Sequence, residues 1–276
     1  MTLDWAAGSG RLSAGGASLE WSTWGSAPGR DPVIVLLHEG LGCVAMWRDF
    51  PEALARTTGC SVFAYSRAGY GQSDPCALPR PLDYMTREAK DVLPDVLDAL
   101  GAERVFLLGH SDGATIAAEY CGLVADYRVR GLCLMAPHFF TEPQGLEQIA
   151  RARDAYSNAG LQAKLARYHR DPDCAFWGWN DAWLSDGFRD WHVGEVIDHL
   201  RIPSLVIQGH QDTYGSIAQV DEVVDRSYAP VEILVLPDCG HAPHLEHRDA
   251  VLMTIVEFIT RLERIEAAEV ETVCKR

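Results

Sequence analysis

Ser111 lies in a Gly-x-Ser-x-Gly pattern that spans residues 109–113. The apolar run 105–108 before it predicts a buried strand, and the pattern of residues 112–124 after it predicts a helix. Glycines two positions on either side of the serine allow a sharp turn, which would raise the hydroxyl above the strand end, beside a helix N-terminus. The backbone N–H of Asp112 would then point at an anion formed on an attacked carbonyl group. This context predicts that Ser111 is a nucleophile.

A serine hydroxyl is a weak nucleophile and needs a base, which in turn needs a group that orients it. His241 follows the apolar run 231–236, and Asp212 lies just beyond the run 204–208. A loop that follows a strand can reach a nucleophile at the same sheet edge. The residues occur in the order Ser111, Asp212, His241, and we predict that they form a catalytic triad.

Other residues compete for these roles. Asp238 is an alternative acid, but it lies only three residues before His241 and looks like a turn residue. His244 and His247 are alternative bases, for which packing or helix capping is the simpler interpretation. A metal site built from His241, His244 and His247 lacks a matching ligand set elsewhere, so we predict no metal.

The elements that would position these residues alternate along the chain. Apolar runs are separated by stretches with helical periodicity. Strands that are apolar on both faces are typical of a parallel sheet covered by helices, so this order predicts a doubly wound α/β fold. Strands are expected at 33–37, 61–65, 105–108, 131–135, 204–208 and 231–236, with 17–24 as an edge strand or hairpin arm; helices are expected at 83–100, 112–124, 217–226 and 248–266.

The interval 141–201 interrupts this alternation, because it contains helix-like stretches and no strand-like run. About 60 residues without a strand is too long for a loop in a compact domain. We interpret the interval as a helical insertion over the ends of the strands. The last residues, from Ala267, look like a frayed tail.

Composition limits the classes of protein. The chain has 276 residues, of which 47% are hydrophobic and 23% charged, as is typical of a soluble globular protein. A net charge of −15 disfavours nucleic acid and anionic membranes as partners. No apolar run approaches the roughly 18 residues of a membrane helix, and no basic signal-peptide region is visible. We therefore expect a cytoplasmic protein, with a homodimer left open.

The chain shows no sign of a cofactor. No G-x-G-x-x-G pattern and no Walker-type glycine loop with lysine is present, so we expect a small-molecule substrate and no nucleotide. The eight cysteines are scattered and include no C-x-x-C pair. We expect them to be reduced, mostly buried thiols.

Together, these motifs resemble those of the α/β-hydrolase fold superfamily, over nearly the whole chain. Residues 109–113 resemble its nucleophile elbow, 209–212 its acid turn, 240–246 its histidine loop, and 66–73 the glycine-rich loop that follows its fourth strand. The resemblance implies an eight-stranded, mostly parallel sheet. It also implies that residues 141–201 form a mobile helical cap, inserted after the sixth strand into a core domain of residues 1–140 and 202–276.

The loop 38–42 resembles the family's His-Gly-x-x-Gly oxyanion loop. The resemblance implies that Gly40 donates a second backbone N–H beside that of Asp112, with Leu41 as the next candidate donor. The sequence departs from the motif at Glu39, where glycine is usual, and a carboxylate there would oppose developing negative charge unless it is paired or points away. Glu39 is either structural, bonded to Arg48 or Arg67, or it takes part in substrate recognition or proton transfer.

Aromatic side chains are concentrated between residues 139 and 191. Ligand pockets are lined mostly by such residues, so we expect an apolar acyl or aryl pocket there, with His138 at its border. The residues expected to line this pocket are Glu39, His138, Phe139, Trp177, Trp179 and Trp183.

The serine limits the chemistry. Haloalkane dehalogenases and epoxide hydrolases of this fold use an aspartate at the elbow, whereas serine fits acyl transfer. We predict a serine hydrolase that cleaves a small or medium carboxylic ester with an apolar acyl or aryl group, with thioester or lactone hydrolysis as variants. Two alternatives remain open: a C–C bond hydrolase of ring-cleavage products with the same triad, and a non-catalytic ligand receptor on the same fold.

Overall fold

A computed structural model of the chain describes residues 3–29 and 31–268. Eight strands of this part form one sheet, in the order β1-β2-β4-β3-β5-β6-β7-β8. β2 pairs antiparallel with β1 and β4, and all other neighbours are parallel. The predicted doubly wound, mostly parallel eight-stranded sheet is therefore confirmed. The strands are β1 (Ser9–Ala14), β2 (Ala17–Trp24), β3 (Val33–Leu37), β4 (Ser61–Tyr65), β5 (Val105–His110), β6 (Val129–Met135), β7 (Ser204–Gly209) and β8 (Val231–Leu236).

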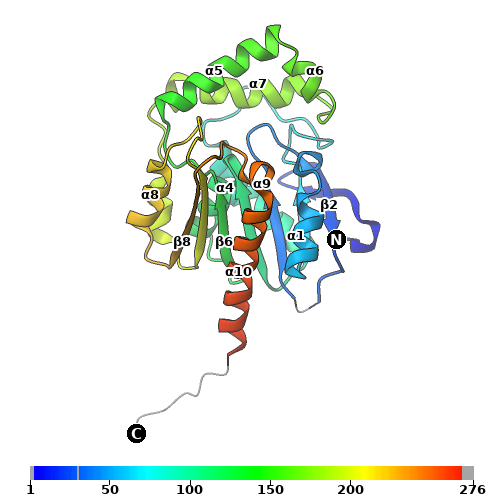
Figure 1. Cartoon of the computed structure of the whole chain (residues 1–276). Helices are drawn as coiled ribbons and strands as arrows, with labels where there is room; N and C mark the ends of the chain where they lie inside the picture. Colours follow the sequence, from blue (N-terminus) through cyan, green and yellow to red (C-terminus); the bar gives the residue numbers. More distant parts are fainter. Residues whose placement is uncertain (1–2, 30, 269–276) are drawn as a thin grey trace.

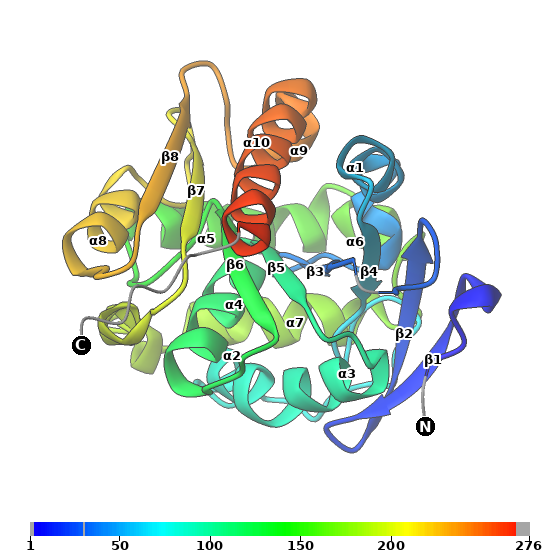
Figure 2. The same ribbon diagram turned by 90° about the horizontal axis from the view of Figure 1, so that it is seen from below.

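Helices cover both faces of the sheet (Figures 1 and 2). In β3, Val33, Val35 and Leu37 pack into one hydrophobic cluster, whereas Ile34 and Leu36 pack into a second. An apolar residue at every position buries both faces of the strand, as a parallel sheet between helices requires. One face carries α1 (Phe50–Thr58) and α10 (Arg248–Ala267); the other carries α2 (Tyr84–Arg87), η3 (Glu88–Val92), α3 (Leu93–Leu100), α4 (Asp112–Leu123) and α8 (Ala218–Arg226).

Between β6 and β7 the chain forms a helical segment at the top of Figure 1, beyond the carboxyl ends of the parallel strands. The helices at the top are α5 (Pro143–Asn158), α6 (Leu161–Leu165) and α7 (Pro172–Trp183). After η4 (Asp186–Phe188), the chain returns toward β7 through η5 (Gly194–His199), which packs against α4. The Asp171 carboxylate accepts the Cys174 N–H at 2.9 Å, and Pro172 occupies the first turn, so α7 begins with two favourable capping features. The separation of this segment as a cap domain, and its mobility, stay predictions.

Three features differ from the expected elements. The edge of the sheet is β1, which the sequence did not suggest, so β2 is the inner arm of a hairpin. Helix α1 was also not expected. The helix expected over residues 83–100 is widened by the π-helical turn η3, just before Pro94. Proline has no N–H to donate and its ring crowds the carbonyl four residues earlier, which explains a wider turn at this point.

Seven cysteines lie in the described part, and all have free thiols, five of them buried. Cys274 and the tail from residue 269 lie outside the described residues. Within residues 3–29 and 31–268, none of the helices combines the length and the apolarity that a bilayer crossing demands.

Candidate active site

Ser111 occupies the sharp turn between β5 and α4. Its backbone has φ 54° and ψ −120°, a conformation that residues other than glycine rarely adopt. The turn closes because both flanking glycines lack a side chain: a Cβ at Gly109 would overlap the carbonyl of Gly113, and a Cβ at Gly113 would overlap that of Leu37. The Ser111 N–H donates to the carbonyl of Met135 at 2.9 Å, which ties the turn to β6. The Gly-x-Ser-x-Gly pattern thus forms the strained turn that its spacing suggests.

His241 and Asp212 come from the loops after β8 and β7. Nδ1 of His241 lies 2.7 Å from Oδ2 of Asp212. The carboxylate also accepts Nε2–H of Gln208 at 3.0 Å and the N–H of Tyr214 at 2.8 Å. Burial acts to raise the pKa of Asp212, but the hydrogen bond and charge of His241, with the Tyr214 N–H, outweigh it and lower the pKa to about 2. An ionised carboxylate can only accept, so Nδ1 carries a proton, and in the neutral imidazole the lone pair is then on Nε2.

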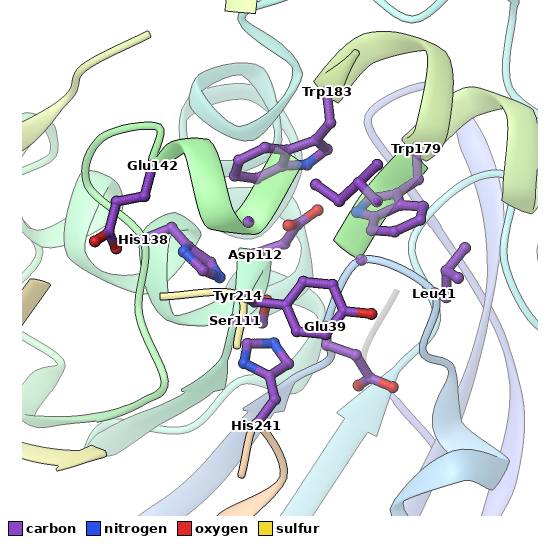
Figure 3. Close-up of a pocket in the computed structure, with 13 residues that line it drawn as sticks. Glu39, Leu41, Ser111, Asp112, His138, Glu142, Trp179, Trp183, Tyr214 and His241 are labelled. Atoms are coloured by element: carbon purple, nitrogen blue, oxygen red, sulfur yellow. The ribbon is translucent and has the colours of Figure 1, made fainter. Parts of the chain in front are cut away.

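Ser111 and His241 line the same cavity, which has a volume of about 160 Å³. Figure 3 shows the imidazole of His241 directly beside Ser111, with Tyr214 against the ring. The structure therefore brings Ser111, Asp212 and His241, which are far apart in the sequence, to one edge of the sheet.

The loop after β3 forms the opposite wall of this cavity. Gly40 and Asp112 both line it, and no acceptor within the described residues contacts either backbone N–H. Arg67 fixes the loop from behind: its guanidinium donates to the carbonyls of His38 at 2.5 Å and Glu39 at 3.1 Å. Two backbone donors thus border the cavity that contains Ser111, an arrangement suited to an oxyanion.

Glu39 does not have the partner that we expected. Its carboxylate Oε2 lies 3.6 Å from Nδ1 of His110, and no ion pair within the described residues joins it to Arg48 or Arg67. Arg67 contacts only the carbonyl oxygen of Glu39, because its guanidinium is committed to two carbonyls and, at 3.6 Å, to the carboxylate of Asp112. The expected arginine pairing of Glu39 is therefore replaced by an imidazole.

The Asp112 side chain is buried in a polar cluster beside the cavity. Its Oδ2 accepts the Tyr84 hydroxyl at 2.5 Å, and that hydroxyl accepts Nε1–H of Trp183 at 3.0 Å. Burial raises the pKa of Asp112 even though Arg67 opposes the shift. The same residue therefore offers a backbone N–H to the cavity and anchors Trp183 through Tyr84.

The helical segment supplies the remaining wall. Trp179 and Trp183 of α7 line the cavity, as do Glu39 and His138 (Figure 3). Two residues that we expected to line the cavity, Trp177 and Phe139, lie elsewhere. Trp177 lies about 200° around α7 from Trp179, so it packs against Tyr156 instead.

Phe139, the second of these residues, is fully buried in the hydrophobic core. Its backbone N–H donates to Gln219 at 2.7 Å, which holds this part of the chain after β6 against α8. Its neighbour His138 reaches the cavity, and burial lowers the pKa of His138 to about 3, so this imidazole is neutral near pH 7.

Comparison with known proteins identifies the family. A family model described as alpha/beta hydrolase family matches residues 34–254. The chain belongs to the α/β hydrolase family. It is 30% identical over 267 residues to the polyketide synthase ThaQ of Burkholderia thailandensis; the alignment covers 87% of the chain and 12% of the synthase. It is 31% identical over 132 residues to epoxide hydrolase 3 of Siraitia grosvenorii, which covers 47% of the chain and 40% of that enzyme.

The α/β hydrolase fold is also evident from solved structures. The enol-lactonase of Burkholderia xenovorans superposes with a TM-score of 0.71 at 20% identity, over 91% of this chain and 100% of that one. By contrast, the chain spans well under half of the length of each of the two sequence relatives named above. The comparisons therefore establish family and fold, and the substrate has to be argued from the cavity itself.

The competing residues of this α/β hydrolase lie apart from the Asp212–His241 pair. Asp238 is exposed, and its carboxylate contacts Nε2–H of Gln211 at 3.4 Å. His247 donates from Nε2 to the Asp238 carbonyl at 3.0 Å, and His244 packs against Trp47. Among the described residues, no group of three or more His, Cys, Asp or Glu side chains is arranged to hold a metal ion.

Some cavity residues escaped the sequence analysis. Tyr214 follows Asp212 closely in the chain, so proximity to the motif was an available signal. The helical pattern of α5 gave no comparable signal, because it does not reveal which face of the helix meets the cavity. The cavity residues in this group are Glu142, Gly145, Ile149 and Tyr214.

Proposed function

We propose that this α/β hydrolase cleaves a small or medium carboxylic ester with an apolar acyl or aryl group. The observation that carries the proposal is the 2.7 Å contact between His241 and Asp212, in a cavity that His241 shares with Ser111. The Nδ1 proton bonded to Asp212 leaves Nε2 as the basic nitrogen beside the serine. A serine at the elbow supports acyl transfer rather than the aspartate chemistry of epoxide opening, despite the partial match to an epoxide hydrolase.

In this mechanism the Ser111 oxygen attacks the ester carbonyl while His241 removes the hydroxyl proton. The carbonyl oxygen becomes an oxyanion that accepts the N–H groups of Gly40 and Asp112. His241 then returns the proton to the leaving alcohol, and an acyl-enzyme on Ser111 remains. His241 then removes a proton from a water molecule, which attacks the acyl-enzyme, and returns that proton to the Ser111 oxygen as the acid is released.

The cavity supports a small, uncharged acyl group. Its volume of about 160 Å³ is close to that of a cavity that accepts benzene, which is about 150 Å³. Trp179, Trp183 and Ile149 supply apolar walls, and no lysine or arginine is among the described residues that line the space. An acyl anion would meet the carboxylate of Glu39 in a cavity whose described lining contains no lysine or arginine to bind it.

The proposal is tested with 4-nitrophenyl acetate and butyrate. We expect a burst of 4-nitrophenol equal to the enzyme concentration, and covalent labelling of Ser111 by a fluorophosphonate. Ser111→Ala should abolish the labelling and lower kcat by roughly 10⁴-fold or more, with residual rate from the oxyanion donors. Ser9→Ala, on the exposed edge strand, is the matched control and should keep the wild-type rate.

Other outcomes separate the alternatives. A lactone or a vinylogous diketone hydrolysed far faster than either ester would move the proposal to a lactonase or a C–C bond hydrolase with the same serine. An enzyme that neither labels with the fluorophosphonate nor turns over any of these substrates would contradict the proposed function and favour a receptor.

A further inference from the structure

A second carboxylate–imidazole contact lies beneath the proposed triad. His110 precedes Ser111, and its Nε2 lies 2.6 Å from the backbone carbonyl oxygen of His241. On the other side of the ring, Nδ1 faces Oε2 of Glu39 at 3.6 Å. One buried ring therefore connects the loop after β3, the nucleophile turn and the loop that carries His241.

The position of Glu39 is built into the fold. Gly42 leaves the space that the carboxylate occupies, because a Cβ there would overlap the oxygens of Glu39. On its backbone side, Glu39 is held by the guanidinium of Arg67. The His110 side chain is only 3% exposed, whereas that of Glu39 is 24% exposed and reaches the cavity. The two groups thus face each other in a fixed arrangement.

The contacts of His110 determine where its protons are. A carbonyl oxygen only accepts hydrogen bonds, so Nε2 must carry a hydrogen to bond to His241. Nδ1 has no hydrogen-bond partner within 3.5 Å in the described part of the chain, and the group that faces it is an acid. A neutral ring would direct its Nδ1 lone pair at a carboxylate. A proton between Nδ1 and Glu39 replaces that repulsion with attraction.

The electrostatics of the surroundings agree with this arrangement. Burial acts to lower the pKa of His110, but Glu39 outweighs it and the pKa is raised. Burial acts to raise the pKa of Glu39, but His110 outweighs it and the pKa is lowered well below its usual range. The other titratable or charged groups that face or interact with the two side chains are His38, Cys43, Arg48, Asp112, His138, Tyr168, His169, Asp212, His241 and His244.

We propose that Glu39 and His110 form a proton-sharing pair that positions the His241 loop. The charged imidazole donates to the His241 carbonyl, while Asp212 holds the ring of the same residue. Charge-assisted hydrogen bonds are about twice as strong as neutral ones, so the pair fixes the loop more firmly than a neutral histidine would. Glu39 is a positioning residue, and the effect of the pair on turnover rests on the proposed function.

The protonation of His110 is tested directly by ¹⁵N NMR of histidine-labelled protein at pH 7.5. The His110 signals are assigned by their loss in His110→Gln. We expect both ring nitrogens of His110 to be protonated in the wild type, and the ring to become neutral in Glu39→Gln. A neutral His110 in the wild type would overturn the proposal. Because this readout needs no turnover, it stays informative even if the proposed function fails.

The positioning role is tested by kinetics with 4-nitrophenyl butyrate. Glu39→Gln should lower kcat by about tenfold, the equivalent of one stronger hydrogen bond, with little change in KM, and should alter the pH profile of kcat. Glu39→Asp, which keeps the charge, should recover part of the rate. Asp238→Asn removes an exposed carboxylate from the loop that carries His241, and this variant should have the wild-type kcat, KM and pH profile. If Glu39→Gln has the wild-type kcat and pH profile, the positioning role is refuted.

Discussion

Ser111 shows how the site depends on conformations that its neighbours enforce. Its positive φ costs on the order of 1–3 kcal/mol, and such strain persists only where the surroundings fix the backbone. Here the Ser111 carbonyl accepts the N–H groups of Ala114 and Thr115, and its N–H is bound by Met135. The three bonds hold the turn, and the glycine at position 113 lets it pack against β3.

We predict that Gly113→Ala disrupts the turn. The new methyl group would overlap the Leu37 carbonyl, which is part of a central strand and cannot move aside. We expect a loss of about 3 kcal/mol in the free energy of unfolding, measured by urea denaturation, together with loss of fluorophosphonate labelling. Gly29→Ala, where a Cβ would meet no atom within 4 Å, is the control. Equal stability of the two variants would refute the packing argument.

At the scale of single residues, the sequence is informative where chemistry is tied to a motif. Ser111, Asp212 and His241 could be singled out because each follows the end of an apolar run by only a few residues. The partner of Glu39 could not be inferred, because it depends on which way a side chain points from its loop. His110 was part of the motif, but only the structure shows that its ring lies between Glu39 and His241.

At the scale of elements, burial decides what the sequence reveals. The strands β3, β4 and β8 have the bounds that the apolar runs predict. Edge strand β1 was missed because it is largely exposed and its residues, Ser-Gly-Arg-Leu-Ser-Ala, show little apolar patterning. The contacts between the helical segment and the core were also beyond prediction. One of these contacts brings Cys76, in the loop after β4, to 3.5 Å from Cys174 in the first turn of α7.

This contact allows a test of whether α7 must move. Diamide should take two hydrogens from Cys76 and Cys174 and join them in a disulfide, which mass spectrometry of non-reduced peptides detects. Burial raises the pKa of Cys76 to about 11, so the reaction should be faster at pH 9 than at pH 7. Because α7 carries Trp179 and Trp183, we expect ester turnover to fall with crosslinking and to return after dithiothreitol.

The matched variant for this experiment is Cys76→Ser, whose turnover should not respond to diamide. If the linked peptide forms and turnover is unchanged, then α7 need not move for substrate to enter, and the prediction of a mobile cap is wrong. Loss of turnover in both proteins would instead indicate oxidation elsewhere.

At the scale of the whole molecule, the fold keeps two buried histidines, His138 and His244, in their neutral form. His244 is 3% exposed and packs against Trp47, Phe50 and His110. Burial lowers its pKa to about 3, as it does for His138. Glu119 has the opposite effect on stability, because burial raises its pKa from 4.5 to about 7. Between these pH values the folded chain holds a proton that the unfolded chain has lost, so acid favours folding at this residue. The stability of the whole chain against pH is therefore a sum of opposing contributions.

Comparing how the free energy of unfolding changes with pH in the wild type and in His244→Phe isolates the contribution of His244. Below pH 6.5 the unfolded chain takes up a proton at this imidazole and the folded chain does not, so acid favours unfolding. Protonation of His244 in the unfolded chain should make the free energy of unfolding of the wild type about 2 kcal/mol smaller at pH 5 than at pH 7.5. His244→Phe should lack this contribution. Urea denaturation at both pH values measures it. Ile255→Val, a buried apolar truncation, should lower stability equally at both. If the wild type and His244→Phe lose the same stability between pH 7.5 and pH 5, then His244 is protonated in the folded chain, and its apolar packing does not keep it neutral.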